Sequence, residues 1–193
     1  MNKLICVAGM PGAGKSVLSD YFVKKGHKFV RFGQITLDIV KKKGLKPNEK
    51  NERKIREGLR KKYGMAAYAI LNYPKFNKLL KEGNVVADGL YSWSEYKYLK
   101  KKFGKRMIVV AVYTPPKVRH ARLSTRKMPK SDKDLRHRPF SVKEAEKRDY
   151  AEIEKLEKGG PIAMANYTLM NTSSLSSFIR QIANLYKEIY NKK

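Results

Sequence analysis

The chain has 193 residues, 41% of them hydrophobic, a size that suits one α/β domain or a core domain with small insertions. It has no apolar run near the ~20 residues that cross a bilayer, and its one cysteine, Cys6, excludes an internal disulfide and a cysteine-based metal site, so we expect a cytoplasmic protein. The formal net charge of +27 calls for anionic partners, which are either nucleic acid or polyphosphate substrates.

Predicted strands and helices alternate along the chain. In chain order we expect strands at 3–8, 27–32, 84–88, 107–113 and 167–170, and helices at 14–25, 35–43, 48–62, 65–81, 92–102, 115–126, 141–158 and 174–190. Pro74 is expected to kink or divide its helix, and Gly159, Gly160 and Pro161 to break the chain. This alternation is typical of a parallel sheet with helices on both faces.

The first predicted strand runs into a glycine-rich loop. Residues 9–16 match the pattern G-x-x-x-x-G-K-[ST] in full. Glycines let backbone N–H groups turn towards phosphate, and the helix that begins here adds the positive end of its dipole. Lys15 is expected to reach the β- and γ-phosphates, and the Ser16 hydroxyl to bind Mg²⁺. The alternative, a fortuitous glycine loop, is disfavoured by the strand before the motif and the helix after it. The predicted ATP-binding residues are Gly9, Met10, Pro11, Gly12, Ala13, Gly14, Lys15, Ser16 and Val17.

A P-loop needs a further acidic group near its metal ion, and Asp88 is the candidate. It ends the apolar stretch 85–87 and precedes Gly89. Ligands of open parallel sheets bind beyond the carboxyl ends of the strands, so Asp88 lies at the P-loop edge if the two strands are neighbours. There it would bind Mg²⁺ or orient an acceptor. The alternative is an ordinary Asp-Gly turn.

Arginines follow the fourth predicted strand. Arg122 and Arg126 share one face of an expected helix, and this face leads into the basic segment 127–139, which has the composition of a mobile loop. Arg138 lies in that segment, and Arg148 stands on the next helix. Cationic donors that close over a transferring phosphoryl group stabilise its charge, so these arginines are candidate phosphate ligands. The alternative is a solvated basic surface.

In these features the chain resembles the P-loop nucleoside-monophosphate kinases, in particular small adenylate-kinase-related archaeal and bacterial proteins that are often labelled AAA-family ATPases. The resemblance covers nearly the whole chain. It rests on residues 9–16, 88–89, 115–116, 122–126, 148–149 and 162–167. The P-loop is the general signal, and the order and spacing of the later pieces make the match specific.

The resemblance implies an α/β fold with a five-stranded parallel sheet in the order 2-3-1-4-5. It implies a single P-loop kinase domain over 1–193, with its core at 1–33, 84–126 and 140–193, an acceptor-binding helical insertion at about 34–83 and a lid at about 127–139. By the same likeness, Arg126, Arg138 and Arg148 would contact the donor phosphates, and Arg60 would contact the acceptor.

The chain also departs from these relatives on the acceptor side. They commonly carry an arginine where this chain has Leu37, and another where it has Tyr91 after Asp88-Gly89-Leu90. Arginine pairs with phosphate in a charge-assisted, often bidentate manner that leucine and tyrosine do not replace. We therefore do not assume that the acceptor is AMP. Tyr91, with Trp93 and Tyr96 behind it, would stack on a base or nucleoside; ordinary helix packing is the favoured alternative for these rings.

The sequence thus predicts an ATP-dependent kinase that transfers the γ-phosphoryl group of ATP-Mg²⁺ to a small acceptor, a nucleotide or nucleoside. The predicted catalytic residues are Lys15, Asp88, Arg126 and Arg148, with Ser16 and Asp88 as metal ligands. The predicted phosphate ligands beyond the P-loop are Arg122, Arg126 and Arg138, and the predicted acceptor contacts are Gln34, Arg60, Asp88 and Tyr91.

Two other functions stay open. Dephospho-coenzyme A kinase shares the core, although Gln34 and Asp38 reproduce its acidic motif poorly. A nucleotide-dependent RNA-binding or assembly ATPase would explain the charge. Nucleic acid is the less favoured partner, because lysine clusters such as Lys41–Lys43 and Lys100–Lys102 stand at expected helix ends without stacking aromatics between them, and charge alone gives non-specific binding. We expect no membrane partner, and a monomer or homodimer.

Overall fold

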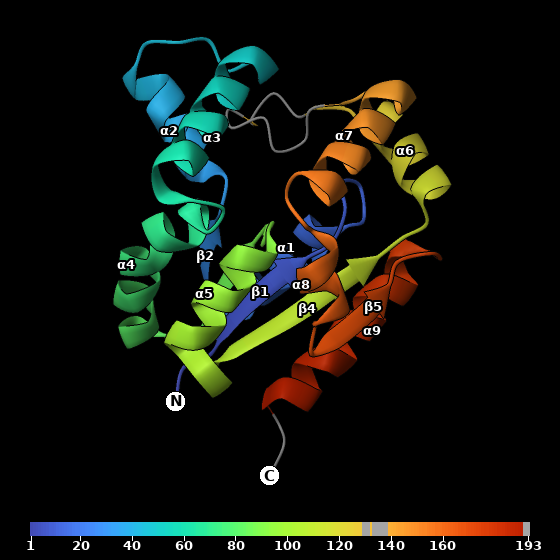
Figure 1. Ribbon diagram of the computed structural model, residues 1–193. Coiled ribbons are helices and arrows are strands. Elements are labelled where there is room, and N and C mark those ends of the chain that lie inside the picture. The colour runs from blue at the N-terminus through green and yellow to red at the C-terminus, as the bar shows by residue number, and fades with distance from the viewer. Residues whose placement is uncertain (129–131, 133–138, 191–193) are drawn as a thin grey trace.

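A computed structural model describes residues 1–128, 132 and 139–190. Its centre is a parallel sheet of five strands in the order β2-β3-β1-β4-β5, as the resemblance implies (Figure 1). The strands are β1 (Leu4–Ala8), β2 (Lys28–Arg31), β3 (Val85–Asp88), β4 (Met107–Tyr113) and β5 (Tyr167–Met170). Every residue of β1 is buried, which explains its continuous apolar sequence, because the central strand of such a sheet is covered on both faces.

Helices cover both faces of the sheet. They are α1 (Lys15–Lys24), α2 (Gln34–Lys42), α3 (Glu49–Tyr63), α4 (Ala67–Glu82), α5 (Trp93–Phe103), α6 (Pro116–Ser124), α7 (Val142–Glu154), α8 (Gly159–Ala163) and α9 (Leu175–Tyr190), with the 3-10 turn η1 (Gly104–Arg106) before β4. Successive side chains of a strand point to opposite faces. Cys6 of β1 accordingly packs in the core under α4 and α5, whereas Val7 packs in the core under α1 and α9.

Two breaks expected from glycine and proline do not occur. Pro74 lies inside the continuous helix α4, where its ring is exposed and buried residues on either side, such as Tyr68 and Phe76, hold the helix to the sheet. The prediction that Gly159, Gly160 and Pro161 break the chain is wrong, because the short helix α8 begins there. Proline is tolerated in the first turn of a helix, since the N–H that it lacks would have no intrahelical partner.

The helices between β2 and β3 belong to two layers. Figure 1 shows α2 and α3 beyond the carboxyl ends of the strands on one side, and α6 and α7 on the other. By contrast, α4 packs on the sheet, with Tyr68 and Phe76 in its core. The P-loop therefore lies between two helical walls. Among the described residues, no helix has both the length and the apolar character needed to cross a membrane.

Candidate active site

The predicted phosphate-binding loop lies between the end of β1 and the start of α1. Gly9 and Gly14 have φ values of 139° and 105°, which side chains rarely allow. A Cβ on Gly9 would lie 2.5 Å from the Val112 carbonyl oxygen, and one on Gly14 would overlap the Asn171 amide. The loop is thus held against β4 and the end of β5 by close backbone approach. Within the loop, Ala13 donates its N–H to the Met10 carbonyl oxygen at 3.2 Å, and glycine-rich turns of this kind form anion-binding cradles.

Lys15 closes this cradle. Its ammonium group donates hydrogen bonds to the carbonyl oxygens of Gly9 and Met10, at 2.9 and 3.0 Å. The loop is braced from the other side, where Thr114 Oγ1 and Asn171 Nδ2 both donate to the Ala13 carbonyl, at 3.1 and 2.8 Å. A cation above a glycine cradle at a helix N-terminus fits a polyphosphate chain.

The Lys15 ammonium is poorly stabilised without an anion. Burial, with a smaller effect from the nearby positive charge of Lys158, lowers the pKa of Lys15 to about 7 against the opposing effect of Asp88. Negative phosphates placed in the cradle would favour the charged form of Lys15. Binding of a triphosphate is therefore coupled to protonation of this side chain.

This coupling predicts proton uptake. One pH unit above the lowered pKa, roughly nine-tenths of the Lys15 side chains are neutral in the free protein, and bound phosphates return them to the charged form. We expect ATP binding at pH 8 to take up about one proton, seen in calorimetry as a binding heat that varies with the ionisation enthalpy of the buffer. At pH 6 the uptake should vanish, because Lys15 is already charged. Equal heats in all buffers at pH 8 would contradict the coupling.

Asp88 lies where the sequence places it. Strands β1 and β3 are neighbours, and Val7 pairs with Asp88 two residues before the P-loop begins. Gly89 and Leu90 donate their N–H groups to the Val7 carbonyl oxygen, at 3.2 and 3.1 Å, so the chain after Asp88 is fastened to the strand that carries the loop. Asp88 is 8% exposed. The role predicted for Asp88 requires that its strand be a neighbour of β1, and the two strands are neighbours.

A buried cluster of charges stands beside Lys15. Lys158, which is 1% exposed, donates to the Glu152 carboxylate, and Arg148 Nε donates to the same carboxylate at 3.1 Å. Burial alone would raise the pKa of Glu152, but the two cations outweigh it and lower this pKa to about 2. The Lys158 ammonium lies 4.8 Å from the centre of the Tyr91 ring, a cation–π contact that joins α8 to the loop after β3.

The sequence reasoning selected Arg148 but missed Lys158 and Glu152. The spacing of Arg148 and Glu152, four residues apart on one helix, is a visible signal for a pair. No sequence signal pointed to Lys158, which the chain reversal after α7 brings back to Glu152.

The arginines of α6 divide into two kinds. Arg119 is buried and structural: its guanidinium forms a bidentate pair with Asp149, at 2.9 and 2.8 Å, and also donates to the Pro11 carbonyl oxygen at 3.1 Å. It therefore fastens α6 to α7 and to the P-loop. Arg122 donates to the Asn171 carbonyl oxygen at 3.0 Å. The helix ends at Ser124, so Arg126, which was expected on the same helical face, lies half-buried in the segment after α6. Arg138 and most of the predicted lid lie outside the described residues.

The predicted acceptor residues come from three elements. Arg60, on α3, lies over the Tyr68 ring with its guanidinium carbon 5.4 Å from the ring centre, and among the described residues its buried Nε has no hydrogen-bond partner. Gln34, on α2, donates instead to Asp38 one turn along its own helix, at 3.0 Å. Tyr91 lies between Gly89 and Gly33, facing the charged cluster. Among the predicted acceptor residues, Arg60 thus has an N–H group, Nε, without a hydrogen-bond partner in the described part of the chain.

Trp93 and Tyr96 serve packing. Their rings stack on each other with centres 4.9 Å apart and an angle of 14° between the planes, and a Cβ on Gly160 would lie 2.9 Å from the Trp93 ring. The favoured alternative for these two rings, helix packing, describes their contacts. Glu95 lies on the same helix with its Oε1 buried and, among the described residues, unpartnered; burial raises its pKa to about 7, against hydrogen bonds from the N–H groups of Tyr91 and Ser92.

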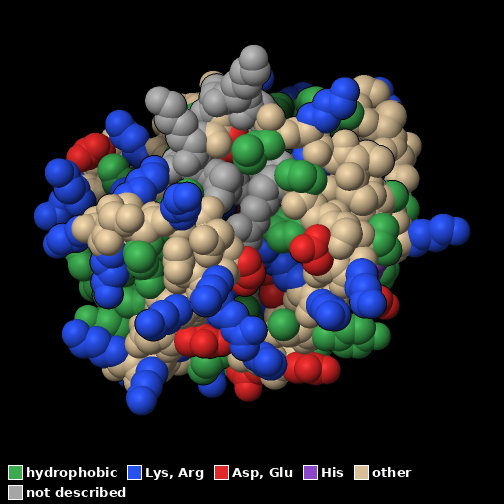
Figure 2. Space-filling model, turned by 90° about the horizontal axis from the view of Figure 1, so that it is seen from above, with side chains coloured by type: hydrophobic (Ala, Val, Ile, Leu, Met, Phe, Trp, Pro, Cys, Tyr) green, Lys and Arg blue, Asp and Glu red, His purple; other side chains and the backbone are tan. Residues whose placement is uncertain are grey.

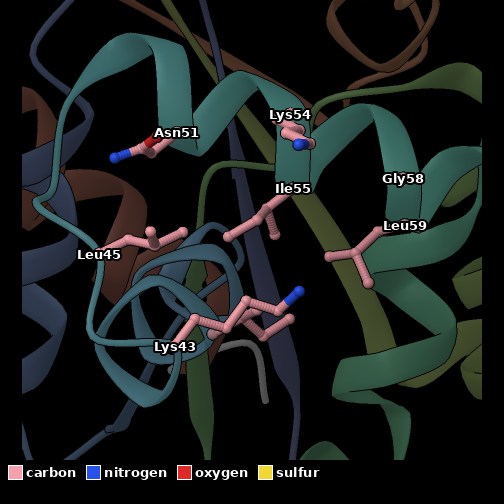
Figure 3. A pocket seen from close by; sticks show the side chains of 8 residues that line it. Lys43, Leu45, Asn51, Lys54, Ile55, Gly58 and Leu59 are labelled. Atoms are coloured by element: carbon pink, nitrogen blue, oxygen red, sulfur yellow. The ribbon is translucent and has the colours of Figure 1, made fainter.

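A hollow of about 310 Å³ lies between α2 and α3 (Figure 3). It is lined by Ile39, Lys43, Leu45, Asn51, Lys54, Ile55, Gly58 and Leu59. None of these is a predicted triphosphate or acceptor residue, and Leu59 immediately precedes Arg60. Figure 2, a view onto the carboxyl ends of the strands, shows that this end of the molecule is hollowed, with acidic and basic side chains around the depression.

The donor set also suits a magnesium ion that arrives with its substrate. No group of three or more His, Cys, Asp or Glu side chains in the described part of the chain is arranged to hold a metal by itself. Mg²⁺ is usually held by one or two protein oxygens, substrate phosphates and water. Ser16, in the first turn of α1, and the Asp88 carboxylate are oxygen donors of this kind.

Sequence comparisons match this chain to a family model and to relatives of similar length. A family model described as an AAA domain matches residues 5–154. A UPF0200 protein of Thermococcus onnurineus is 35% identical over 189 residues, which cover 96% of this chain and 97% of the relative. A UPF0200 protein of Sulfurisphaera tokodaii is 33% identical over 189 residues, with 97% of each covered.

Solved structures with this fold include small-molecule kinases. Shikimate kinase from Acinetobacter baumannii in complex with shikimate has a TM-score of 0.57 at 18% identity and covers 100% of this chain and 96% of its own. A gluconokinase from Sinorhizobium meliloti has a TM-score of 0.56 at 15% identity, with 99% and 97% covered. The predicted P-loop kinase fold is thereby confirmed, and the fold and the AAA match together support a nucleotide-binding, kinase-like role.

Proposed function

Because this chain belongs to the UPF0200 family and carries an AAA domain, we propose that it transfers the γ-phosphoryl group of ATP to a small acceptor. One observation carries the proposal: Lys15 closes a complete P-loop, and Asp88 stands at the same sheet edge on the neighbouring strand. A loop that only held a nucleotide would not need the further cations that gather there. Arg148 and Lys158 lie close enough to Lys15 to lower its pKa.

The residues of the site divide the work of such a transfer. The loop N–H groups and Lys15 would bind the triphosphate and hold its terminal phosphoryl group still. When bound, Mg²⁺ neutralises charge on the phosphate oxygens. Asp88 would orient the acceptor hydroxyl or a metal-bound water, and Arg126 and Arg148 would offset the charge that spreads over the transferring group. Such catalysis consists of positioning and electrostatic stabilisation.

The acceptor is proposed to lie between α3 and the loop after β3. Arg60 approaches this place from α3 with an unused Nε donor, and Tyr91 approaches it from the sheet edge. Leucine at position 37 is buried, at 4% exposed, so the cation that nucleoside-monophosphate kinases place there has no substitute at that position. Among the described residues, Arg60 is the arginine with a buried Nε that has no hydrogen-bond partner, and we propose that the acceptor contacts it.

A screen with γ-labelled ATP tests the proposal. The acceptors to offer are nucleosides, nucleoside monophosphates, dephospho-coenzyme A and, because a shikimate kinase shares the fold, shikimate. We expect label to move to one class of acceptor, and to move only with Mg²⁺ present. Label that appears in orthophosphate alone, whatever acceptor is offered, would contradict the proposal.

A change at Arg60 tests the placement of the acceptor. With Arg60→Ala, we expect the Michaelis constant for the acceptor to rise about tenfold, the loss of a charge-assisted hydrogen bond, while that for ATP stays within about twofold. Arg53→Ala is the matched control, since Arg53 lies on the same helix with its guanidinium exposed and paired with Glu57. If both Michaelis constants change equally with Arg60→Ala, the acceptor does not lie against Arg60.

A further inference from the structure

Lysine side chains crowd the outer face of α4, α5 and η1. Seven of them are exposed: Lys75, Lys78, Lys81, Lys97, Lys101, Lys102 and Lys105. We refer to these seven as the α4–α5 lysine face. The two helices pack side by side (Figure 1), so the exposed lysines of 75–81 and 97–105 stand on adjacent elements.

Few acidic side chains offset this charge. Residues 67–106 are all described, and their acidic residues are Glu82, Asp88 and Glu95. Asp88 and Glu95 are buried towards the active site, which leaves Glu82 as the exposed acid of this stretch, 3.8 Å from Lys28. On α7, by contrast, lysines alternate with exposed acids such as Glu144 and Glu146. Within residues 67–106, the seven exposed lysines of the α4–α5 lysine face thus stand against one exposed acid.

Two aromatic rings lie beside one of these lysines. The Lys102 ammonium lies 5.3 Å from the centre of the Tyr73 ring on α4 and 5.8 Å from that of Tyr98 on α5. The two rings meet edge to face with centres 6.0 Å apart. Tyr73 lies on α4 and Tyr98 on α5, so no regular spacing along the sequence indicates that the two rings meet. Both tyrosines are half-buried, so they fix the two helices as one platform and do not offer open faces for stacking.

The face has no apolar anchor. Among the described residues, none of the exposed large hydrophobic side chains lies on α4 or α5. A membrane-bound surface combines basic residues with apolar side chains that enter the lipid, and a stable protein interface has an apolar centre. A surface of lysines alone matches a ligand that presents regularly spaced negative charges. Nucleic-acid phosphates do so, and contacts to them carry no sequence information.

We infer that the α4–α5 lysine face binds nucleic acid through its phosphates, without regard to sequence. The inference does not rest on the proposed phosphoryl transfer, because the face is made of helix surfaces that hold none of the P-loop residues. A strand held there would also leave the ATP cradle open. Nucleic-acid binding and ATP binding are therefore separable.

The test measures the binding of a labelled single-stranded RNA of mixed sequence by fluorescence anisotropy over a salt series. The variant combines Lys75→Gln, Lys78→Gln, Lys97→Gln and Lys101→Gln and keeps Lys102, which holds the tyrosines. Glutamine preserves helix propensity. With about 0.7 in salt slope per phosphate contact, four lost contacts should flatten the slope of log K against log salt by about 2 to 3 and weaken binding at least about tenfold at 50 mM salt.

The control variant removes the same charge elsewhere, with Lys24→Gln, Lys147→Gln, Lys155→Gln and Lys187→Gln, all at exposed positions. It should keep close to the original slope. Equal losses in both variants would overturn the inference, because diffuse charge would then suffice. Two further results would overturn it: RNA displaced by ATP, which would place the strand in the P-loop cleft, or anionic vesicles bound through the same four lysines at least as tightly as RNA.

Discussion

Lys15→Ala is expected to lower the turnover of phosphoryl transfer by about a thousandfold, the scale of a lost electrostatic contact to a reacting group. Lys15 is the cation that spans the P-loop, from the Gly9 carbonyl to that of Met10. Without it, the terminal phosphate has no cation on the loop side as charge spreads over its oxygens. Turnover is measured as ADP formed under saturating ATP and acceptor.

The same change should leave the folded protein stable. The lowered pKa of Lys15 means that its ammonium is held at a cost in the free protein, because it is buried and lies near the positive charge of Lys158. We therefore expect thermal unfolding of Lys15→Ala to occur at or near the temperature of the original. Lys24→Ala, an exposed position at the end of the same helix, is the control and should retain full turnover. Turnover that survives Lys15→Ala would refute the assigned site.

The second large effect concerns stability and comes from Glu152. Glu152→Gln keeps the size of the side chain but leaves the buried Lys158 and the half-buried Arg148 without the carboxylate that both contact. Removal of one partner from a buried ion pair typically costs about 3–5 kcal/mol, because the other charge stays uncompensated. We expect a loss of this size in the free energy of unfolding from denaturant titration. Glu154→Gln, exposed on the same helix, should change it by less than about 0.5 kcal/mol.

A double variant separates this cause from simple loss of packing. Glu152→Gln combined with Lys158→Met removes the carboxylate together with the cation that it neutralises. The combined loss should be smaller than the sum of the single losses by about 1 kcal/mol or more, as is usual for residues in contact. Strict additivity, or a Glu152→Gln variant as stable as Glu154→Gln, would show that the pair is not the reason for the effect.

The part of the site that is predicted to bind ATP could be predicted from sequence, because most of its residues are contiguous in the chain. The P-loop is one contiguous motif, and its glycines are typical of the positive φ angles found at Gly9 and Gly14. Asp88 required one further step, the order of the strands, which the alternation of strands and helices left open and the resemblance supplied. Once β1 and β3 are neighbours, the carboxyl-end rule places Asp88 beside the loop.

What the sequence did not reveal depends on contacts between distant segments. Lys158 meets Glu152 because the chain reverses after α7, and it meets Tyr91 because α8 packs against α5. Gly159 and Gly160 predicted a break in the chain, but they form the start of helix α8. Tyr73 and Tyr98 lie on separate helices, so their shared contact with Lys102 has no periodic signature. In each case the partner is chosen by tertiary packing, which a pattern along one segment does not record.

The fate of the γ-phosphoryl group tests the central claim most directly. The measurement follows γ-labelled ATP with the acceptor found in the screen and compares label in the acceptor with label in orthophosphate, in the presence and absence of RNA. We predict that most of the label reaches the acceptor, that RNA does not change this share, and that Lys15→Ala lowers the transfer by about a thousandfold. ATP hydrolysis that RNA stimulates, with no label in any small acceptor, would contradict the account.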